Sequence, residues 1–376
     1  MPSVVRLPLG RDRPTDRRIA HLQTALAQAP SRVDLWVELG NIHLRQDGLR
    51  AAEDSFRRAL SLNQDSSAAH HGLGVTLRRR GELESAARSL ERAVALEPGW
   101  IGAWNDLAAC QETLGKAREA VESYRRILHQ GSDLPQAWYN FGNAQVEVGD
   151  LSGARESYLE GLRLGGSEFT LLYNLGWVQS RLGQTDEAIA SYRRSLEFRR
   201  ESYRSWYNLG NLLLQVDQAD EARQCLRRAA SLRRDDPEIW NNLGNACLDC
   251  GRTFEAARCY RKALQLDPGF HSAWNNLGIL HERDERPGEA LDCYRRCLEL
   301  APNHPMYQLN RTLVLVTLQQ PEEAIRELTR LVESEPNFGC LLGTLEALDP
   351  LRSRPDFRKL LPLLGPPPEN PTPKGP

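Results

Sequence analysis

The stretch from Pro237 to Gly278 reads PEIWNNLGNACLDCGRTFEAARCYRKALQLDPGFHSAWNNLG, and it contains the pentapeptide WNNLG twice. Its two tryptophans, Trp240 and Trp274, are 34 residues apart. A period of this length indicates a repeat architecture, which has to be established before any single residue is interpreted. We therefore number each repeat from 1 to 34, with the tryptophan at position 4.

The same period extends in both directions from this stretch. Steps of 34 residues back from Trp240 reach Trp206, Leu172, Trp138, Trp104, His70 and Trp36. Nine units then fit between Val33 and Phe338 without insertion or deletion. Position 20 is alanine in every unit: Ala52, Ala86, Ala120, Ala154, Ala188, Ala222, Ala256, Ala290 and Ala324. A match in strict register over nine units predicts tandem repeats over residues 33–338.

Each unit has the pattern of two helices joined by a tight turn. Two segments of helical length carry periodic apolar residues, and glycine occupies position 15 between them in five units. Glycine is the residue that most readily ends a helix in the left-handed conformation. Small residues at positions 8 and 20 allow close approach of the two helices, and large ones at positions 4, 7 and 24 fill the space around them. One such hairpin cannot bury its apolar faces alone, so the pattern predicts an all-α stack of repeats.

This set of residues resembles the tetratricopeptide repeat (TPR), with tryptophan at position 4, leucine and glycine at 7 and 8, alanine at 20, an aromatic residue or leucine at 24 and proline at 32. The resemblance covers about four fifths of the chain. It implies a right-handed superhelical solenoid of tandem helix-turn-helix repeats. It also implies that positions 2, 5, 6, 9, 12 and 13 of the first helix line a concave groove.

The segments outside the repeats have their own patterns. We expect a disordered N-terminus at residues 1–14, a capping helix equivalent to half a repeat at 15–32, capping helices at 339–364, and a disordered proline-rich tail at 365–376. The ninth unit departs from the pattern, because Gln308, Arg311 and Thr312 stand where tryptophan, leucine and glycine are expected. Polar residues at these positions suit a solenoid that is close to its end.

Composition excludes several classes of partner. The formal net charge is -2, with 26% charged and 40% hydrophobic residues. This balance gives no overall field that attracts nucleic acid or an anionic membrane. The first twenty residues have no signal-peptide core, and the longest apolar stretch, from Leu313 to Leu318, is too short to span a bilayer. We expect a cytoplasmic protein with neither nucleic acid nor membrane as a partner.

No motif predicts catalysis, a cofactor or a metal. His281 and Glu282 begin a metalloprotease-like string that no second histidine completes. Cys247 and Cys250 have a spacing found in zinc and redox sites, but a zinc site needs a second pair. Packed helices lie 8–10 Å apart, beyond the Cα reach of a disulfide between equivalent helices. Reduced structural cysteines are therefore favoured, and zinc is the alternative.

Two columns of polar residues recur in register. Basic pairs at positions 25 and 26 predict a solvated outer face, with an acidic partner as the alternative: Arg57–Arg58, Arg125–Arg126, Arg193–Arg194, Arg227–Arg228, Arg261–Lys262 and Arg295–Arg296. Position 6 carries asparagine in six consecutive units: Asn140, Asn174, Asn208, Asn242, Asn276 and Asn310. Asparagine is unfavourable inside helices, so a run of six requires an explanation.

An asparagine amide can bind both polar groups of a peptide unit, because it has two donors and a carbonyl acceptor. The neighbouring positions support this hypothesis, with Asn143, Asn211 and Asn245 at position 9 and Tyr139, Tyr173 and Tyr207 at position 5. The ladder resembles that of the superhelix of O-linked N-acetylglucosamine transferase, but residues 339–376 are too few for its catalytic domain. The alternative is that these asparagines only bond to neighbouring helices.

The sequence thus predicts a protein that is not an enzyme and that binds a protein or peptide. In the first hypothesis it is an adaptor that holds an extended peptide in the concave groove. In the second it is a structural scaffold that self-associates or docks folded partners through its convex face or edges. The identity of the partner and the oligomeric state stay open, because one repeat fold serves many tasks.

Overall fold

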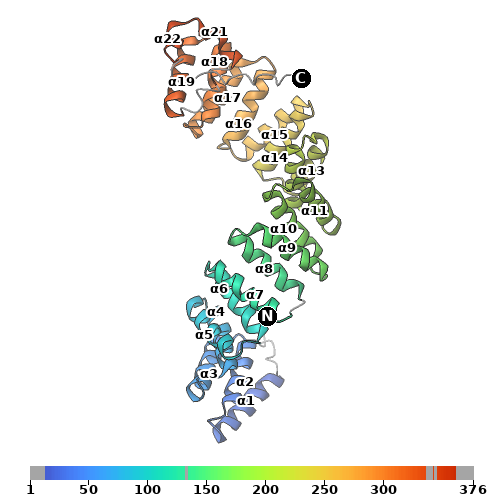
Figure 1. Ribbon diagram of the computed structural model, residues 1–376, viewed down its shortest axis with the longest axis vertical. Helices are drawn as coiled ribbons and strands as arrows, with labels where there is room; N and C mark the ends of the chain where they lie inside the picture. Colours follow the sequence, from blue (N-terminus) through green and yellow to red (C-terminus); the bar gives the residue numbers. More distant parts are fainter. Residues whose placement is uncertain (1–12, 132–133, 336–341, 343–344, 361–376) are drawn as a thin grey trace, which may run out of the picture. The chain divides into compact units, whose positions relative to one another are not determined.

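The computed structural model describes residues 13–131, 134–335, 342 and 345–360, which form helices and turns with no strand among them (Figure 1). The chain divides into two compact units, residues 1–198 and 199–376. The first unit contains α1 (Arg13–Gln28), α2 (Val33–Arg45), α3 (Leu49–Leu62), α4 (Ser67–Arg79), α5 (Leu83–Leu96), α6 (Ile101–Thr113), α7 (Ala117–His129), α8 (Pro135–Glu147), α9 (Leu151–Arg163), α10 (Glu168–Arg181) and α11 (Thr185–Phe198). The second contains α12 (Tyr203–Gln215), α13 (Ala219–Leu232), α14 (Pro237–Asp249), α15 (Thr253–Leu266), α16 (His271–Arg283), α17 (Pro287–Leu300), α18 (Pro305–Thr317), α19 (Pro321–Ser334), η1 (Glu346–Leu348), α21 (Asp349–Arg352) and α22 (Pro355–Arg358).

The helices form pairs, and the pairs follow the 34-residue period of the sequence. The even-numbered helices from α2 to α18 are the first helices of the nine repeats, and each begins at position 1 of its repeat except α10, which begins one residue early. From α1 to α11, and again from α12 to α19, each helix contacts the next along the chain. The predicted all-α fold of tandem helical pairs is confirmed.

The turn inside each pair has one left-handed residue, always at position 15. Glycine fills this position in five repeats, with φ between 70° and 85°. Asp47, Asp217, Glu285 and Gln319 fill it in the other four, with φ between 55° and 59°. The turn geometry is therefore the same in all nine repeats, although a side chain other than glycine is strained in this conformation.

The two helices of a pair meet where small residues face a large ring. The position-20 alanines are completely buried in all nine repeats. A Cβ atom on Gly244 would lie 2.4 Å from the Tyr260 ring, and one on Gly278 would lie 2.7 Å from the Tyr294 ring. Both rings are fully buried. Glycine at position 8 therefore provides the space that the position-24 ring occupies.

Successive repeats are linked by a hydrogen bond from position 4. The indole Nε1 of Trp240 donates to the carbonyl oxygen of Arg234, six residues earlier, at 2.9 Å. Trp36, Trp104, Trp206 and Trp274 make the same bond to the residue six positions earlier. Gln308 donates its amide to Pro302 at 2.9 Å, and His70 Nε2 lies 2.9 Å from the Gln64 carbonyl. Two of the three departures from tryptophan thus keep a side-chain nitrogen at this position, and the third, Leu172, does not.

Buried apolar side chains cover both ends of the repeats. On α1, Leu22 and Leu26 pack with Leu39 and Ile42 of α2. After α19, residues 348, 351, 357 and 360 are buried in one cluster with the cores of α18 and α19. Residues 1–12 and 361–376 lie outside the described residues, as do 336–341 and 343–344, so the expected disorder of the two termini and the limits of the C-terminal cap stay predictions.

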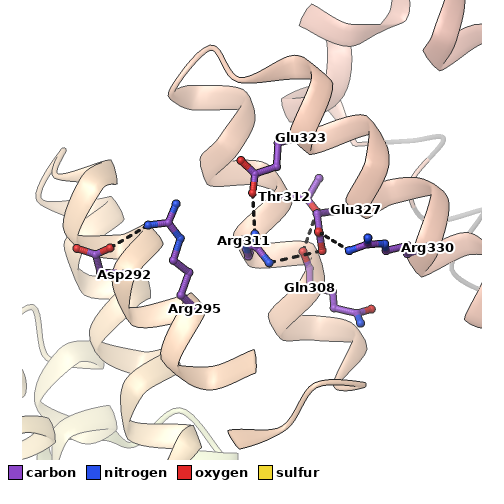
Figure 2. Close-up of polar contacts among 8 residues, drawn as sticks. All are labelled: Asp292, Arg295, Gln308, Arg311, Thr312, Glu323, Glu327 and Arg330. Carbon is purple, nitrogen blue, oxygen red and sulfur yellow. Dashed lines mark hydrogen bonds and ion pairs between the residues drawn. The ribbon is translucent and has the colours of Figure 1, made fainter. Parts of the chain in front are cut away.

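Polar residues in the ninth repeat form ion pairs and hydrogen bonds with one another, although Nε of Arg311 is buried without a partner (Figure 2). Arg311 stands at the leucine position of α18 and donates to Glu323 at 2.8 Å, and it lies 3.7 Å from Glu327. Glu327 also pairs with Arg330 at 3.2 Å. The buried hydroxyl of Thr312 donates to a carbonyl in its own helix at 2.8 Å. This repeat replaces apolar packing with a paired ionic cluster, which is how it tolerates its polar substitutions.

Candidate functional site

The asparagines predicted at position 6 all lie on first helices, from α8 to α18, and all are partly buried. The amide groups of four of them, Asn174, Asn242, Asn276 and Asn310, donate to the preceding repeat. Asn242 Nδ2 donates to Asn211 Oδ1 at 3.0 Å and to the Tyr207 hydroxyl at 3.1 Å. Asn276 Nδ2 donates to Asn245 Oδ1 and to Asn241 Oδ1, both at 3.0 Å. The acceptors therefore stand at positions 9 and 5 of the repeat before.

The same contact recurs where the preceding repeat supplies an acceptor. Asn174 Nδ2 lies 3.2 Å from Asn143 Oδ1, and Asn310 Nδ2 lies 2.9 Å from Asn275 Oδ1. The repeat before Asn140 has an alanine at position 9, and Asn140 accepts from Gln136 of its own helix at 2.9 Å and interacts with Tyr124 of the repeat before. The partner that each asparagine finds thus depends on the side chains of the preceding repeat.

The first three repeats carry other residues at position 6. Asp106 lies 2.8 Å from His71 Nε2 and 2.9 Å from an Arg78 nitrogen. Glu38 pairs with Arg18 of α1 at 2.6 Å. This column therefore has ionic contacts at its N-terminal end and amide contacts further along.

Two of the position-9 asparagines, Asn143 and Asn245, each accept two hydrogen bonds with one oxygen. Asn245 Oδ1 accepts from the Tyr260 hydroxyl at 2.9 Å in addition to Asn276. Asn143 Oδ1 accepts from the Tyr158 hydroxyl at 2.7 Å in addition to Asn174. Both acceptor directions of each carbonyl are then used.

The network leaves specific atoms uncommitted. Within the described ranges, Nδ2 of Asn143 and Nδ2 of Asn245 donate to no other residue. Neither atom is among the buried atoms that lack a partner, so both are open to solvent. The same holds for Oδ1 of Asn310. Solvent therefore reaches free amide donors at position 9 and a free amide acceptor at position 6.

The predicted tyrosines are partly buried and in contact with neighbouring aromatic rings or asparagines. Tyr139 lies 6.3 Å from Tyr158 between ring centroids, and Tyr173 lies 5.8 Å from Tyr192. Burial raises the pKa of Tyr207 to about 12, so its hydroxyl stays neutral and can accept from Asn242. We name the side chains at positions 5, 6 and 9 of the first helices the asparagine face, and each unit carries its own part of it.

A second polar pair, present inside several of the repeats, was missed in the sequence. Position 11 contacts position 23, as in the bonds from Ser123, Ser157 and Ser191 to the glutamine twelve residues earlier, at 2.6–2.7 Å. In the seventh repeat the same pair is Cys247 and Cys259. A hydrogen bond from the Cys259 thiol lowers the pKa of Cys247, and that bond and burial raise the pKa of Cys259. The signal that the sequence offered was the recurrence of polar residues at positions 11 and 23, which are twelve residues apart.

The cysteines pack in the core or donate hydrogen bonds to nearby oxygens. Those in the described residues are free thiols, and Cys250 Sγ lies 3.6 Å from an Asp220 oxygen. The two members of the Cys247–Cys250 motif therefore have different partners. Among the residues that the structure describes, no group of three histidine, cysteine or acidic side chains could hold a metal ion.

Comparison with known proteins places this geometry in context. Solved structures similar to the chain include MamA, with 25% identity over 43% of this chain and 94% of that one at a TM-score of 0.42. MamA 41-end from Desulfovibrio magneticus RS-1 has 21% identity over 45% and 95% at a TM-score of 0.44. YrrB, described as a TPR protein with an unusual peptide-binding site, has 20% identity over 53% and 99% at a TM-score of 0.46. No curated protein matches the sequence.

Models of the tetratricopeptide repeat match the sequence itself. One matches residues 17–67, 37–100, 71–135 and 139–204, a second matches 181–246, and a third matches 235–303. Together these matches extend over residues 17–135 and 139–303, and they follow the helical pairs seen in the structure. The chain therefore belongs to the tetratricopeptide-repeat family.

Proposed function

We propose that this protein is a non-enzymatic adaptor that holds an extended peptide segment of a partner protein on the asparagine face. The family supports the general part of the proposal, because the tetratricopeptide repeat is a protein-interaction fold. The specific part rests on one observation. The bonds between repeats orient the amides so that free donors remain at position 9 and a free acceptor at position 6.

Free amide groups of both kinds match the chemistry of a peptide backbone. A peptide unit has one N–H donor and one carbonyl acceptor, and it carries no charge. Asn245 can donate to such a carbonyl while its own oxygen stays bonded to Tyr260 and Asn276. Since these amides are already fixed by their neighbours, binding would cost little side-chain entropy.

The same bonds support the alternative in which the asparagines only brace the repeats. The two hypotheses assign different roles to one atom, the free Nδ2 of Asn245: it donates to the peptide in the first and has no role in the second. Replacement by alanine would remove both roles together. Asn245→Asp keeps an oxygen that accepts from Tyr260 and Asn276, and it replaces only the free donor.

The test starts from a random peptide library displayed on phage and selected against the full chain. A selected peptide is synthesised with a fluorophore, and its affinity is measured for wild type and Asn245→Asp. We expect about a tenfold loss or more, because a carboxylate opposes a peptide carbonyl where an amide donated to it. Asn303→Asp makes the same charge change at an exposed turn residue and should leave the affinity unchanged.

N-methylation of the peptide backbone provides the second arm. A methylated peptide nitrogen has no N–H group that could donate to the position-6 oxygen. Methylation of at least one position of the peptide should therefore abolish binding. Affinity that is insensitive both to Asn245→Asp and to N-methylation would exclude the asparagine face. A selection that yields no peptide would exclude it as well.

Two further expectations remain. None of the described helices is long and apolar enough to cross a membrane. The cytoplasmic location stays a prediction. The absence of enzymatic activity is part of the proposal, supported by a family whose members are generally interaction modules.

A further inference from the structure

A groove lies between the second helices of the sixth and seventh repeats, α13 and α15, with α14 beneath them. Its volume is about 770 Å³. None of its lining residues belongs to the asparagine face, so it is a separate feature of the second unit.

The floor of the groove is apolar. Trp240, Leu243 and Cys247 of α14 form it. The indole N–H of Trp240 is already bonded to the Arg234 carbonyl at 2.9 Å, so the ring presents carbon atoms. A floor of this kind suits a large apolar side chain.

The rim of the groove is strongly basic. Arg227, Arg234, Arg258, Arg261 and Lys262 line it, with Glu255 as its one carboxylate. Glu255 is already paired with Arg227 and with Arg252, both at 2.9 Å. In the described part of the chain, the other four rim cations form no ion pair. These charges are therefore available in a protein whose net charge is -2.

An equivalent groove in the first compact unit, residues 1–198, shows that the charge of the rim is independent of the shape of the groove. It lies four repeats earlier, has a volume of about 440 Å³, and has Trp104 and Leu107 at the positions of Trp240 and Leu243. Its rim carries Glu91 where the second unit has Arg227, and Glu122 where it has Arg258. The fold produces the groove, and the sequence sets its sign.

We propose that the basic groove binds an acidic peptide segment of a partner protein, with one large apolar side chain on Trp240 and carboxylates on Arg234, Arg258 and Arg261. Charge complementarity selects an acidic occupant. The apolar floor between the cations suits a polypeptide in which an apolar side chain stands between carboxylates. A single-stranded nucleic acid also combines cationic and aromatic contacts, and the oligothymidine measurement below distinguishes it. This site is independent of the proposed peptide binding on the asparagine face.

The probe is a short fluorescein-labelled peptide of aspartate and glutamate with one central phenylalanine, measured by fluorescence anisotropy on the full chain. Arg258→Glu with Arg261→Glu changes the net charge of the rim from +4 to zero and should weaken binding by about tenfold or more. Arg295→Glu with Arg296→Glu makes the same change of net charge on α17, and we expect less than about a threefold effect because only long-range attraction changes. Helicity measured by circular dichroism confirms that both variants fold.

Trp240→Gln tests the floor without removing the structural hydrogen bond, since Gln308 makes that bond in the ninth repeat at 2.9 Å. This variant should bind the probe about tenfold more weakly than wild type does. Wild type should bind a probe with alanine in place of phenylalanine about tenfold more weakly than the original probe. Asn245→Asp should have no effect, which separates this site from the asparagine face.

Four binding results, and the absence of any binding, would overturn the proposal. The first is an equal loss of affinity in the two charge-reversal pairs, and the second is equal binding of the probe without phenylalanine. The third is preferential binding of a single-stranded oligothymidine that the same variants abolish, which would make the occupant a nucleic acid. The fourth is self-association of wild type that Arg258→Glu with Arg261→Glu removes, which would make it a second copy of the chain. Absence of any probe binding would also reject the site.

Discussion

Replacement of Asn276 by alanine tests whether the amide network holds neighbouring repeats together. Asn276 donates to Asn241 and Asn245 at 3.0 Å each. Asn245 keeps its bond from Tyr260, so the loss there is about 1 kcal/mol. Asn241 is only 5% exposed and its oxygen would be stranded, which costs about 2 kcal/mol. Alanine regains roughly 0.6 kcal/mol of helix propensity, so we expect a net loss of about 2–3 kcal/mol at this interface.

The matched control is Asn105→Ala on α6. Asn105 is exposed and makes no side-chain hydrogen bond to a described residue, so the same substitution should stabilise its helix by roughly 0.5 kcal/mol. Repeat arrays unfold through coupled neighbours, so the measurement is native-state hydrogen exchange of the α14 and α16 amides, alongside urea unfolding followed by circular dichroism. If Asn276→Ala left exchange in α16 unchanged, or shifted unfolding as Asn105→Ala does, the amides would not be braces.

Four further predictions concern the fold. Gly278→Ala places a Cβ 2.7 Å from a buried tyrosine ring and should cost about 1–3 kcal/mol in urea unfolding. Gly288→Ala, with no atom within 4 Å, should instead gain about 0.4–1 kcal/mol, and similar shifts would contradict the packing argument. Glu285→Gly should raise the melting temperature, because the left-handed glutamate at φ 55° is relieved of about 1 kcal/mol of strain, and a fall would count against it. Gln308→Leu should lose about 1 kcal/mol that Gln308→Trp retains, since only tryptophan keeps the N–H donor, and equal urea midpoints would refute this role. Burial lowers the pKa of His281 below its unfolded value of 6.5, because the charged imidazole is unfavourable in the folded protein. The stability that the neutral histidine contributes is therefore present above pH 6.5 and is lost as the pH falls through the folded pKa. Unfolding at pH 5 and 8 should show a pH-dependent loss that His281→Leu reduces, and an equal loss in both proteins would exclude the histidine.

The repeat architecture could be predicted from the sequence because one contact recurs nine times. A single alanine or tryptophan carries little information, but each of them at a fixed period defines the helical pair. The left-handed turn was predicted from the glycines alone. At Glu285 and Gln319 the residue type gives no such signal, and only the register shows that the turn is the same.

The role of the asparagines could be predicted only as two alternatives. An amide at position 6 can reach a ligand or the repeat before it, and the choice depends on the distance between repeats, which the residue types do not contain. The structure shows that Asn242 and Asn276 donate to the preceding repeat. It adds a point that the sequence could not supply, namely which amide atoms stay free after those bonds form.

The cysteines show a different limit of sequence reasoning. The argument from spacing compared cysteines at the same position of successive repeats, which lie on separate helices. The contact that forms is instead between positions 11 and 23 of one repeat, as in Cys247 and Cys259. Serine and glutamine make this contact in other repeats, and leucine stands at position 11 in three more, so the fold requires no particular chemistry there.

The two grooves separate what the fold requires from what it leaves free. Trp104 and Trp240 have equivalent positions and the same hydrogen bond to the carbonyl six residues earlier. The rim residues above them differ in sign, with Glu122 in one groove and Arg258 in the other. Because both grooves form, the rim charge is not needed to build either of them. A charge that packing does not require, and that no described residue neutralises at Arg258, is therefore best explained by what the groove binds.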